Sequence, residues 1–128
     1  MKQNIKLRFT EPEYFINRKK NRVRCKMNFT IEGDKNLLSS VMAFVGTTND
    51  PISPEVIAEA TPSNGDTFNV EVGMKVSRAK AETLAYKRVA KLFGRFIKYQ
   101  EQVVDSISIF SDKATFIVNH NNEYVHKF

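Results

Sequence analysis

The stretch RVRCKMNFTIE, residues 22–32, alternates apolar and polar side chains from end to end. Successive side chains of a β-strand point to opposite faces, so this alternation predicts a strand with one buried and one solvated face. The apolar face holds Val23, Cys25, Met27, Phe29 and Ile31, and the other face begins with Arg22, Arg24 and Lys26. This strand is the clearest local signal in the chain, and the other elements are placed around it.

Signals on either side of this strand indicate a hairpin and a short helix. Residues 5–9, IKLRF, also alternate and predict a first strand, joined to residues 22–32 by the basic turn INRKKNR. Apolar residues at helical spacing then predict a core helix over residues 37–45, with Asn36 as its N-cap and Gly46 just past its end.

Residues 56–60, VIAEA, fit two elements. Ser53 and Pro54 could cap and begin a helix. The short run before Pro62 is instead typical of a strand. We favour a connecting strand, followed by a turn at residues 62–66, PSNGD.

The stretch SRAKAETLAYKRVAKLFGRFIKYQ, residues 77–100, holds seven basic residues against one acid. Asn69 is the expected N-cap of a helix that starts near Val70 and ends between Lys98 and Val103. On a helical wheel, a broad apolar side opposes a contiguous basic face. The apolar side consists of Ala79, Ala85, Tyr86, Val89, Ala90, Leu92, Phe93, Phe96 and Ile97, and the basic face of Lys80, Lys87, Arg88, Lys91, Arg95 and Lys98.

The segments after this helix predict two or three short strands, with turns at SDK (residues 111–113) and NHNN (residues 119–122). Their expected core residues are Ile107, Ile109, Phe116, Val118, Tyr124 and Val125. The sequence therefore predicts one α+β domain over residues 1–128. Its expected parts are an N-terminal β-hairpin, a short helix, a connecting strand, one long amphipathic basic helix and a C-terminal β-meander.

Composition argues against several classes of function. The formal net charge is +6, and no apolar run is long enough to span a membrane. The N-terminus lacks the apolar core of a signal peptide, so we expect a cytoplasmic protein. The single cysteine, Cys25, is expected in the core. His120 and His126 have no partners at metal-ligand spacing, and no catalytic or cofactor motif occurs, so we expect neither a metal site nor an enzyme.

The positive charge is concentrated in two segments. Residues 18–26 hold six and residues 75–98 hold eight of the 20 basic residues. Like charges on one helix face repel each other, which favours an anionic partner that relieves the repulsion, although a solvated face would have the same pattern. The predicted ligand-binding residues are Lys87, Arg88, Lys91, Arg95 and Lys98, with Tyr99 stacking on a base, and Arg22 and Arg24 from the first segment.

Arg78 and Glu82 are a charged pair, four residues apart, on the apolar side of the wheel. One interpretation is an ion pair within the helix at the margin of the core. The other is a contact with a second subunit or with a ligand, because a charged pair on an apolar face is costly unless it is well satisfied.

The segment ATPSNGDTFNVEVGMKVSRAKAETLAYKRVAKL, residues 60–92, resembles a recurring segment of small phage and prophage proteins. The shared pattern is a strand ending in proline, an Asp-x-Phe-Asn turn, a glycine, and a helix rich in Ala, Arg and Lys. It is carried by Pro62, Asp66, Phe68, Asn69, Gly73, Lys75, Arg78, Ala79, Ala81, Ala85 and Tyr86. Small phage proteins of this size and layout include the anti-Thoeris and anti-CBASS sponges, and this similarity implies an oligomer that traps a nucleotide signal without cleaving it. In the segment, Gly73 is expected to permit close approach of another chain.

The same helix is also similar to the last helix of a double-stranded RNA-binding domain, but the three-stranded sheet that should directly precede it is missing. We therefore hypothesise a non-catalytic, oligomeric, phage-type anti-defence protein that sequesters a phosphate-bearing nucleotide. One alternative is a nucleic-acid-binding accessory protein that adds Arg18 and Lys19 to the basic face. Another is an inhibitor that docks on the acidic surface of a host defence enzyme.

Overall fold

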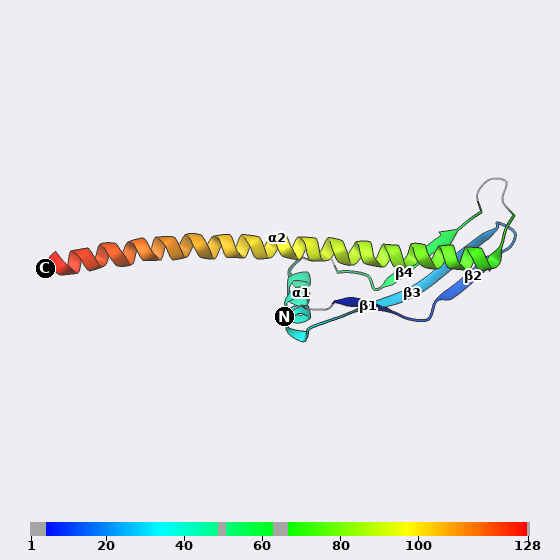
Figure 1. Ribbon diagram of the computed structural model, residues 1–128, viewed down its shortest axis with the longest axis horizontal. Coiled ribbons are helices and arrows are strands. Elements are labelled where there is room, and N and C mark those ends of the chain that lie inside the picture. The colour runs from blue at the N-terminus through cyan, green and yellow to red at the C-terminus, as the bar shows by residue number, and fades with distance from the viewer. Residues whose placement is uncertain (1–4, 49–50, 63–66, 128) are drawn as a thin grey trace. The chain divides into compact units, whose positions relative to one another are not determined.

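The computed structural model describes residues 5–48, 51–62 and 67–127 and confirms the α+β class. Over these residues it contains four strands and two helices (Figure 1). In chain order they are β1 (Lys6–Phe9), β2 (Glu13–Asn17), β3 (Arg22–Glu32), α1 (Lys35–Thr48), β4 (Glu55–Ala60) and α2 (Val70–Lys127). The chain forms two compact units, Met1–Phe93 and Gly94–Phe128, and α2 contributes to both.

β3 is the central strand of the sheet, because the other three strands all pair with it in antiparallel fashion. β1 and β2 follow one another along one edge of β3, and β4 lies along the other edge (Figure 1). Phe9 opposes Phe29, whereas Glu13 opposes Lys26, so the register slips by one residue between β1 and β2. This slip is a β-bulge, and it leaves Pro12 outside the paired segments. At that place the missing N–H of proline removes no hydrogen bond between strands.

The first part of α2 runs across one face of this sheet (Figure 1). Small residues recur every four positions on the covering side of the helix, at Gly73, Ser77, Ala81 and Ala85. They let the helix backbone approach β3 so closely that an ideal Cβ on Gly73 would lie 2.6 Å from Cγ2 of Val23. The close approach predicted for Gly73 is therefore to β3 of its own chain. The core that results contains Cys25, Met27, Phe29, Val56, Ala58, Ala81, Ala85 and Val89.

The N-cap of α1 lies two residues before the predicted one. Asp34, and not Asn36, is the N-cap, because the Asp34 Oδ2 accepts a hydrogen bond of 3.0 Å from the N–H of Leu37. The carbonyl of Asp34 also accepts the first helical bond, from the N–H of Leu38. A carboxylate at this position adds a favourable interaction with the helix dipole, which an amide lacks.

The C-terminal end of α1 also differs from the prediction, since the helix continues through Gly46 to Thr48. The hydroxyls of Thr47 and Thr48 donate hydrogen bonds to carbonyls one turn back, at 2.7 and 2.8 Å. The carbonyl groups in the last turn of a helix lack backbone partners within the helix, and these hydroxyls supply hydrogen bonds to two of them. In a helix that ends at glycine, backbone N–H groups beyond the helix end would supply such bonds.

Residues 55–60 form a strand, as predicted, and α2 begins at Val70, as predicted. The Oδ1 of Asn69 accepts a hydrogen bond from the N–H of Val72 at 3.2 Å, which confirms the N-cap. The predicted turn at PSNGD, with Asp66 closing it, falls mainly on residues 63–66, which lie outside the described residues.

Residues 94–127 are helical throughout, so the predicted C-terminal β-meander and the predicted end of the helix between Lys98 and Val103 were wrong. The expected turns SDK and NHNN lie within α2. All six residues expected in the core of the meander are exposed. The physical reason is spacing: apolar residues recur at alternating intervals of three and four, which is a helical period, while the β-branched residues around them imitate a strand in composition.

The buried side of α2 is narrower than the wheel predicted. Ala85, Val89 and Leu92 are buried, as predicted. The ring of Tyr86 instead rests against Phe9, with ring centroids 6.1 Å apart, and 55% of the tyrosine is exposed. Three further residues of the predicted apolar side are exposed, namely Ala79, Ala90 and Ile97. The side chains that face the sheet form a narrow strip along the helix, and the residues on either side of this strip are exposed.

Replacing Gly73 with alanine should destabilise the protein. The new methyl group would meet Val23 at 2.6 Å from Cγ2 and 3.2 Å from Cβ, and overpacking of this kind costs about 1–3 kcal/mol. Gly94→Ala is the matched control, because nothing lies within 4 Å of an ideal Cβ there. In the control, alanine should stabilise the helix by up to about 1 kcal/mol. Urea unfolding of both variants checks this, and equal stabilities would contradict the close contact.

Candidate functional site

The net positive charge belongs to one of the two units. Met1–Phe93 contains 16 Lys and Arg against 10 Asp and Glu, a net charge of +6, whereas Gly94–Phe128 contains four of each and is neutral. Anions are attracted to the unit that carries the excess charge. A site for an anionic partner is therefore expected among the first 93 residues.

Some of these cations are neutralised on the outer face of the sheet, the face away from α2. Arg24 and Glu59 form the closest pair, with Nη2 and Oε1 2.6 Å apart. The other pairs join Lys26 to Glu55, and Lys6 and Arg8 to Glu32. Exposed ion pairs add little to stability, but they reduce the charge that this part of the sheet presents to an anion.

Arg78 and Glu82 form the intrahelical ion pair of the first interpretation, since the Arg78 Nε donates to the Glu82 Oε1 at 3.3 Å. The pair lies near the buried thiol of Cys25. Burial raises the pKa of Cys25, with smaller opposing effects from Arg78, which lowers it, and Glu82, which raises it. The thiol is therefore protonated at neutral pH and is a poor nucleophile. A contact of the pair with a second subunit or a ligand stays a prediction.

The predicted basic face of α2 divides into residues with different surroundings. Lys87 and Lys91 are exposed, and neither has a partner within the described part of the chain. The Arg88 Nη1 instead donates to the carbonyls of Ser53 and Glu55, at 3.1 and 2.5 Å. Arg88 therefore fastens α2 to the start of β4, which leaves it less able to hold a phosphate.

The remaining predicted residues belong to the second unit and to the sheet. Arg95, Lys98 and Tyr99 belong to the second unit, where Lys98 is exposed and Tyr99 is 42% exposed. Arg22 and Arg24 lie on the outer face of the sheet, which α2 does not cover. The structure thus distributes the eight predicted ligand-binding residues over the sheet, the first part of α2 and the second unit.

The turn between β2 and β3 carries the densest group of unpaired cations. Arg18, Lys19, Lys20 and Arg22 are all exposed, and no acidic residue occurs in the sequence between Glu13 and Glu32. Asn21 closes the turn with a left-handed φ of 50°, a conformation that asparagine tolerates well. The Asn17 Oδ1 accepts a hydrogen bond of 3.1 Å from the backbone N–H of Lys20. We call these four basic residues the hairpin cations.

A small hollow adjoins the hairpin cations on the outer face of the sheet. Its volume is about 270 Å³, and it is lined by Phe15, Ile16, Asn17, Lys20, Arg22, Arg24 and Glu59. Phe15 is 53% exposed and sits opposite Arg24 in the β2–β3 register. The hollow therefore combines one exposed aromatic ring with three cationic side chains and one carboxylate.

Glu59 is the carboxylate in the lining of the hollow, and its charge state follows from its cationic neighbours. Its pKa is lowered first by the hydrogen bond from Arg24 and then by the positive charges of Arg24, Arg22 and Lys20, although desolvation opposes this. The carboxylate is therefore ionised at neutral pH and orients the guanidinium of Arg24. Lys20, Arg22 and the turn residues Arg18 and Lys19 keep their charge free for an anion.

Of the residues that line this hollow, the sequence analysis predicted Arg22 and Arg24 as binding residues, and it missed the aromatic residue Phe15. Residues 13–17, EYFIN, form a strand whose outward side chain is aromatic, but Ile16 and Asn17 were assigned to the turn. An aromatic residue just ahead of a run of cations was the available signal.

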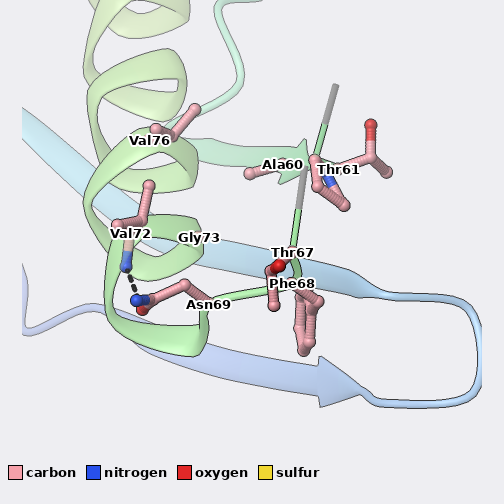
Figure 2. A pocket seen from close by; sticks show the side chains of 9 residues that line it. Ala60, Thr61, Thr67, Phe68, Asn69, Val72, Gly73 and Val76 are labelled. Carbon is pink, nitrogen blue, oxygen red and sulfur yellow. Dashed lines mark hydrogen bonds between the residues drawn. The ribbon is translucent and has the colours of Figure 1, made fainter. Parts of the chain in front are cut away.

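A second cavity lies where β4 gives way to the start of α2 (Figure 2). Its volume is about 310 Å³, and its lining includes Phe68, Val72 and Val76 beside the Asn69 cap. Among the described residues, no charged side chain lines it. The described part of its lining therefore differs from the hollow beside the hairpin cations, which contains three cationic side chains.

Comparison with protein-family models, with curated proteins and with solved structures finds no match for this chain. Within residues 5–48, 51–62 and 67–127, no three His, Cys, Asp or Glu side chains are grouped as they would be around a metal ion. Among the same residues, neither helix combines the length and apolar character needed to cross a membrane.

Removing the guanidinium of Arg24 should raise the pKa of Glu59 towards its ordinary value. An NMR titration of the Glu59 carboxyl carbon in Arg24→Gln measures this directly, and Lys26→Gln, whose partner is Glu55, is the control. Because the folded-state pKa is lowered, the stabilising effect of Glu59 exists above its unfolded-state pKa and is lost as the pH falls through the folded-state value. An unchanged Glu59 titration in Arg24→Gln would contradict this assignment.

Proposed function

We propose that this protein binds single-stranded nucleic acid, without cleaving it, through the hairpin cations and Phe15. The observation that carries the proposal is the position of Phe15, whose exposed ring lies beside Lys20 and Arg22. An exposed aromatic ring on a basic sheet surface can stack on an unpaired base while the cations hold the phosphates. Bases within a duplex are stacked on one another, so a double-stranded ligand would gain only the phosphate contacts.

The size of the hollow favours a strand over a small enclosed ligand. Pockets that enclose small molecules have volumes of roughly 300–1,000 Å³, whereas this hollow has about 270 Å³. It has room for one base or one sugar–phosphate unit. Arg18 and Lys19 lie in the turn just beyond its lining, where they would meet the neighbouring phosphates of a longer chain.

Lys87 and Lys91 form a second basic surface, which is separate from the first. They belong to α2, which covers the inner face of the sheet, whereas Phe15 lies on the outer face. In the proposal these lysines add long-range attraction for a polyanion and take no part in stacking.

A second candidate function is the sequestration of a phosphate-bearing nucleotide signal by a phage-type anti-defence protein. The same hollow favours it, because one aromatic ring beside Lys20 and Arg22 also suits a single base with its phosphate. The two candidates differ in what limits binding. The affinity for a nucleic-acid strand increases with each further phosphate that contacts the protein. A single nucleotide has no such further phosphates along a chain, so its affinity does not depend on length.

The proposed function is tested by fluorescence anisotropy with labelled oligothymidylates of increasing length. Affinity should rise with length and fall with salt, and a duplex of equal length should bind more weakly. Phe15→Ala should weaken binding by about 1–3 kcal/mol, the usual loss for one stacked base. Phe116→Ala, which removes an even more exposed aromatic residue from the neutral unit, is the control and should change nothing.

The contribution of Lys20 and Arg22 is tested by the salt dependence of binding. Lys20→Gln with Arg22→Gln should reduce the slope of log K against log salt by about 1.4, which corresponds to two lost phosphate contacts to a single strand. Lys35→Gln, which removes an exposed cation at the start of α1, should leave the slope unchanged. Affinity that does not depend on length would contradict the proposal. An intact nucleotide released by heating the purified protein would favour the second candidate.

A further inference from the structure

A regular apolar stripe runs along α2 within the second unit. From Phe96 to Tyr124, residues on this stripe are separated alternately by four and three positions. Its members are Phe96, Gln100, Val103, Ile107, Phe110, Ala114, Ile117, Asn121 and Tyr124. This is the a/d pattern of a heptad repeat, continued over four heptads, and we call it the heptad stripe. Its a positions are Gln100, Ile107, Ala114 and Asn121, and its d positions are Phe96, Val103, Phe110, Ile117 and Tyr124. Such spacing is the signature of helices that pack along their length against other helices.

The composition of this helix does not suit a helix standing alone in water. The segment VVDSISIFS, residues 103–111, consists almost entirely of β-branched residues, serine and aspartate, and NHNN adds three asparagines at residues 119–122. These residue types are weak helix formers. Helices that lack intrinsic propensity are stabilised chiefly by packing of an apolar face. A helix over residues 94–127 therefore depends on a partner for that face.

The apolar surface is large enough for a stable interface. At four of the five d positions of the stripe the next residue is also apolar and widens the stripe, namely Ile97, Val104, Val118 and Val125. With Ile107, Phe110 and Ile117 these make seven large side chains, each between 45% and 70% exposed. If each contributes on the order of 100 Å², one copy offers roughly 700 Å². That approaches the roughly 800 Å² per partner of a standard protein interface.

Charge and polarity indicate which partner fits. The unit has four basic and four acidic residues, so two copies do not repel each other as two copies of the basic unit would. The two amides in the stripe, Gln100 and Asn121, both occupy a positions. In parallel helices a positions face their own counterparts, so each amide would meet an identical amide and form a hydrogen bond. In an antiparallel pair each amide would face a d position, such as Val103 or Tyr124, without that match.

We infer that residues 96–125 join copies of this chain through the heptad stripe, with the helices parallel. A two-stranded coiled coil needs only two apolar positions per heptad, and the apolar residues beside the d positions make this stripe broader than that. The stripe therefore suits a bundle of three or more helices as well as a pair. This inference does not depend on the proposed function, because its residues all belong to the neutral unit.

The association is tested by the mass in solution of the full chain. Sedimentation equilibrium should give a multiple of the 14.7 kDa of one chain. Phe110→Glu with Ile117→Glu should reduce the mass to one chain and lower the helical circular dichroism signal, because the stripe then carries charge. The control is Ile109→Glu with Phe116→Glu, which changes an isoleucine and a phenylalanine, both at least as exposed as the tested pair, that lie off the stripe and should keep the assembly. A wild-type protein that stays monomeric up to its solubility limit overturns the inference.

Orientation is tested by cross-linking, which does not require a charge in the stripe. Ala114→Cys should form a disulfide between chains under mild oxidation, because an a position meets its own counterpart only in parallel helices. The native Cys25 is buried and does not compete. Ile109→Cys, off the stripe, should remain uncross-linked. An oligomer in which Ala114→Cys does not cross-link overturns the parallel arrangement.

Discussion

The contact of α2 with β3 is the constraint on which the first unit depends. Gly73, Ser77, Ala81 and Ala85 allow the helix to lie directly on the apolar face of the strand. Because β3 pairs with β1, β2 and β4, fixing the helix on β3 fixes it against the whole sheet. Arg88 adds a second attachment, to the start of β4. With one face of the sheet closed in this way, the outer face is the side left for a ligand.

The two units divide charge and apolar surface between them. The first carries the whole net charge and contains the buried core, whereas the second is neutral and exposes most of its large apolar residues. This division matches a chain in which one part meets an anion and the other meets copies of itself. Joining several weak basic sites in one assembly raises the strength of binding to a long polyanion without any new contact, because each further site binds at high effective concentration.

The sequence analysis was right for several local patterns, although the N-cap of α1 was misplaced by two residues and the helix continues past its predicted end to Thr48. The alternation of residues 22–32, the strand before Pro62 and the Asn69 cap each depend on near neighbours, and all three are present. It was wrong after Gly94, where β-branched residues and short polar runs imitate strands and turns while the apolar spacing is helical. In the candidate site, the basic segment of residues 18–26 was found, but Phe15 was not, because residues 13–15 were assigned to no element and Ile16 and Asn17 to the turn.

The sequence by itself determined the class of the fold, the position of β3, the start of α2 and the excess of positive charge. These follow from periodicity, capping and composition, which act over a few residues. Only the tertiary structure decided which cations are free. Arg24 is held by Glu59 and Arg88 by backbone carbonyls more than 30 residues away in sequence, whereas Lys20 and Lys87 have neither constraint. Such pairing depends on which elements become neighbours in the fold, namely β3 and β4 for Arg24 and α2 and the start of β4 for Arg88.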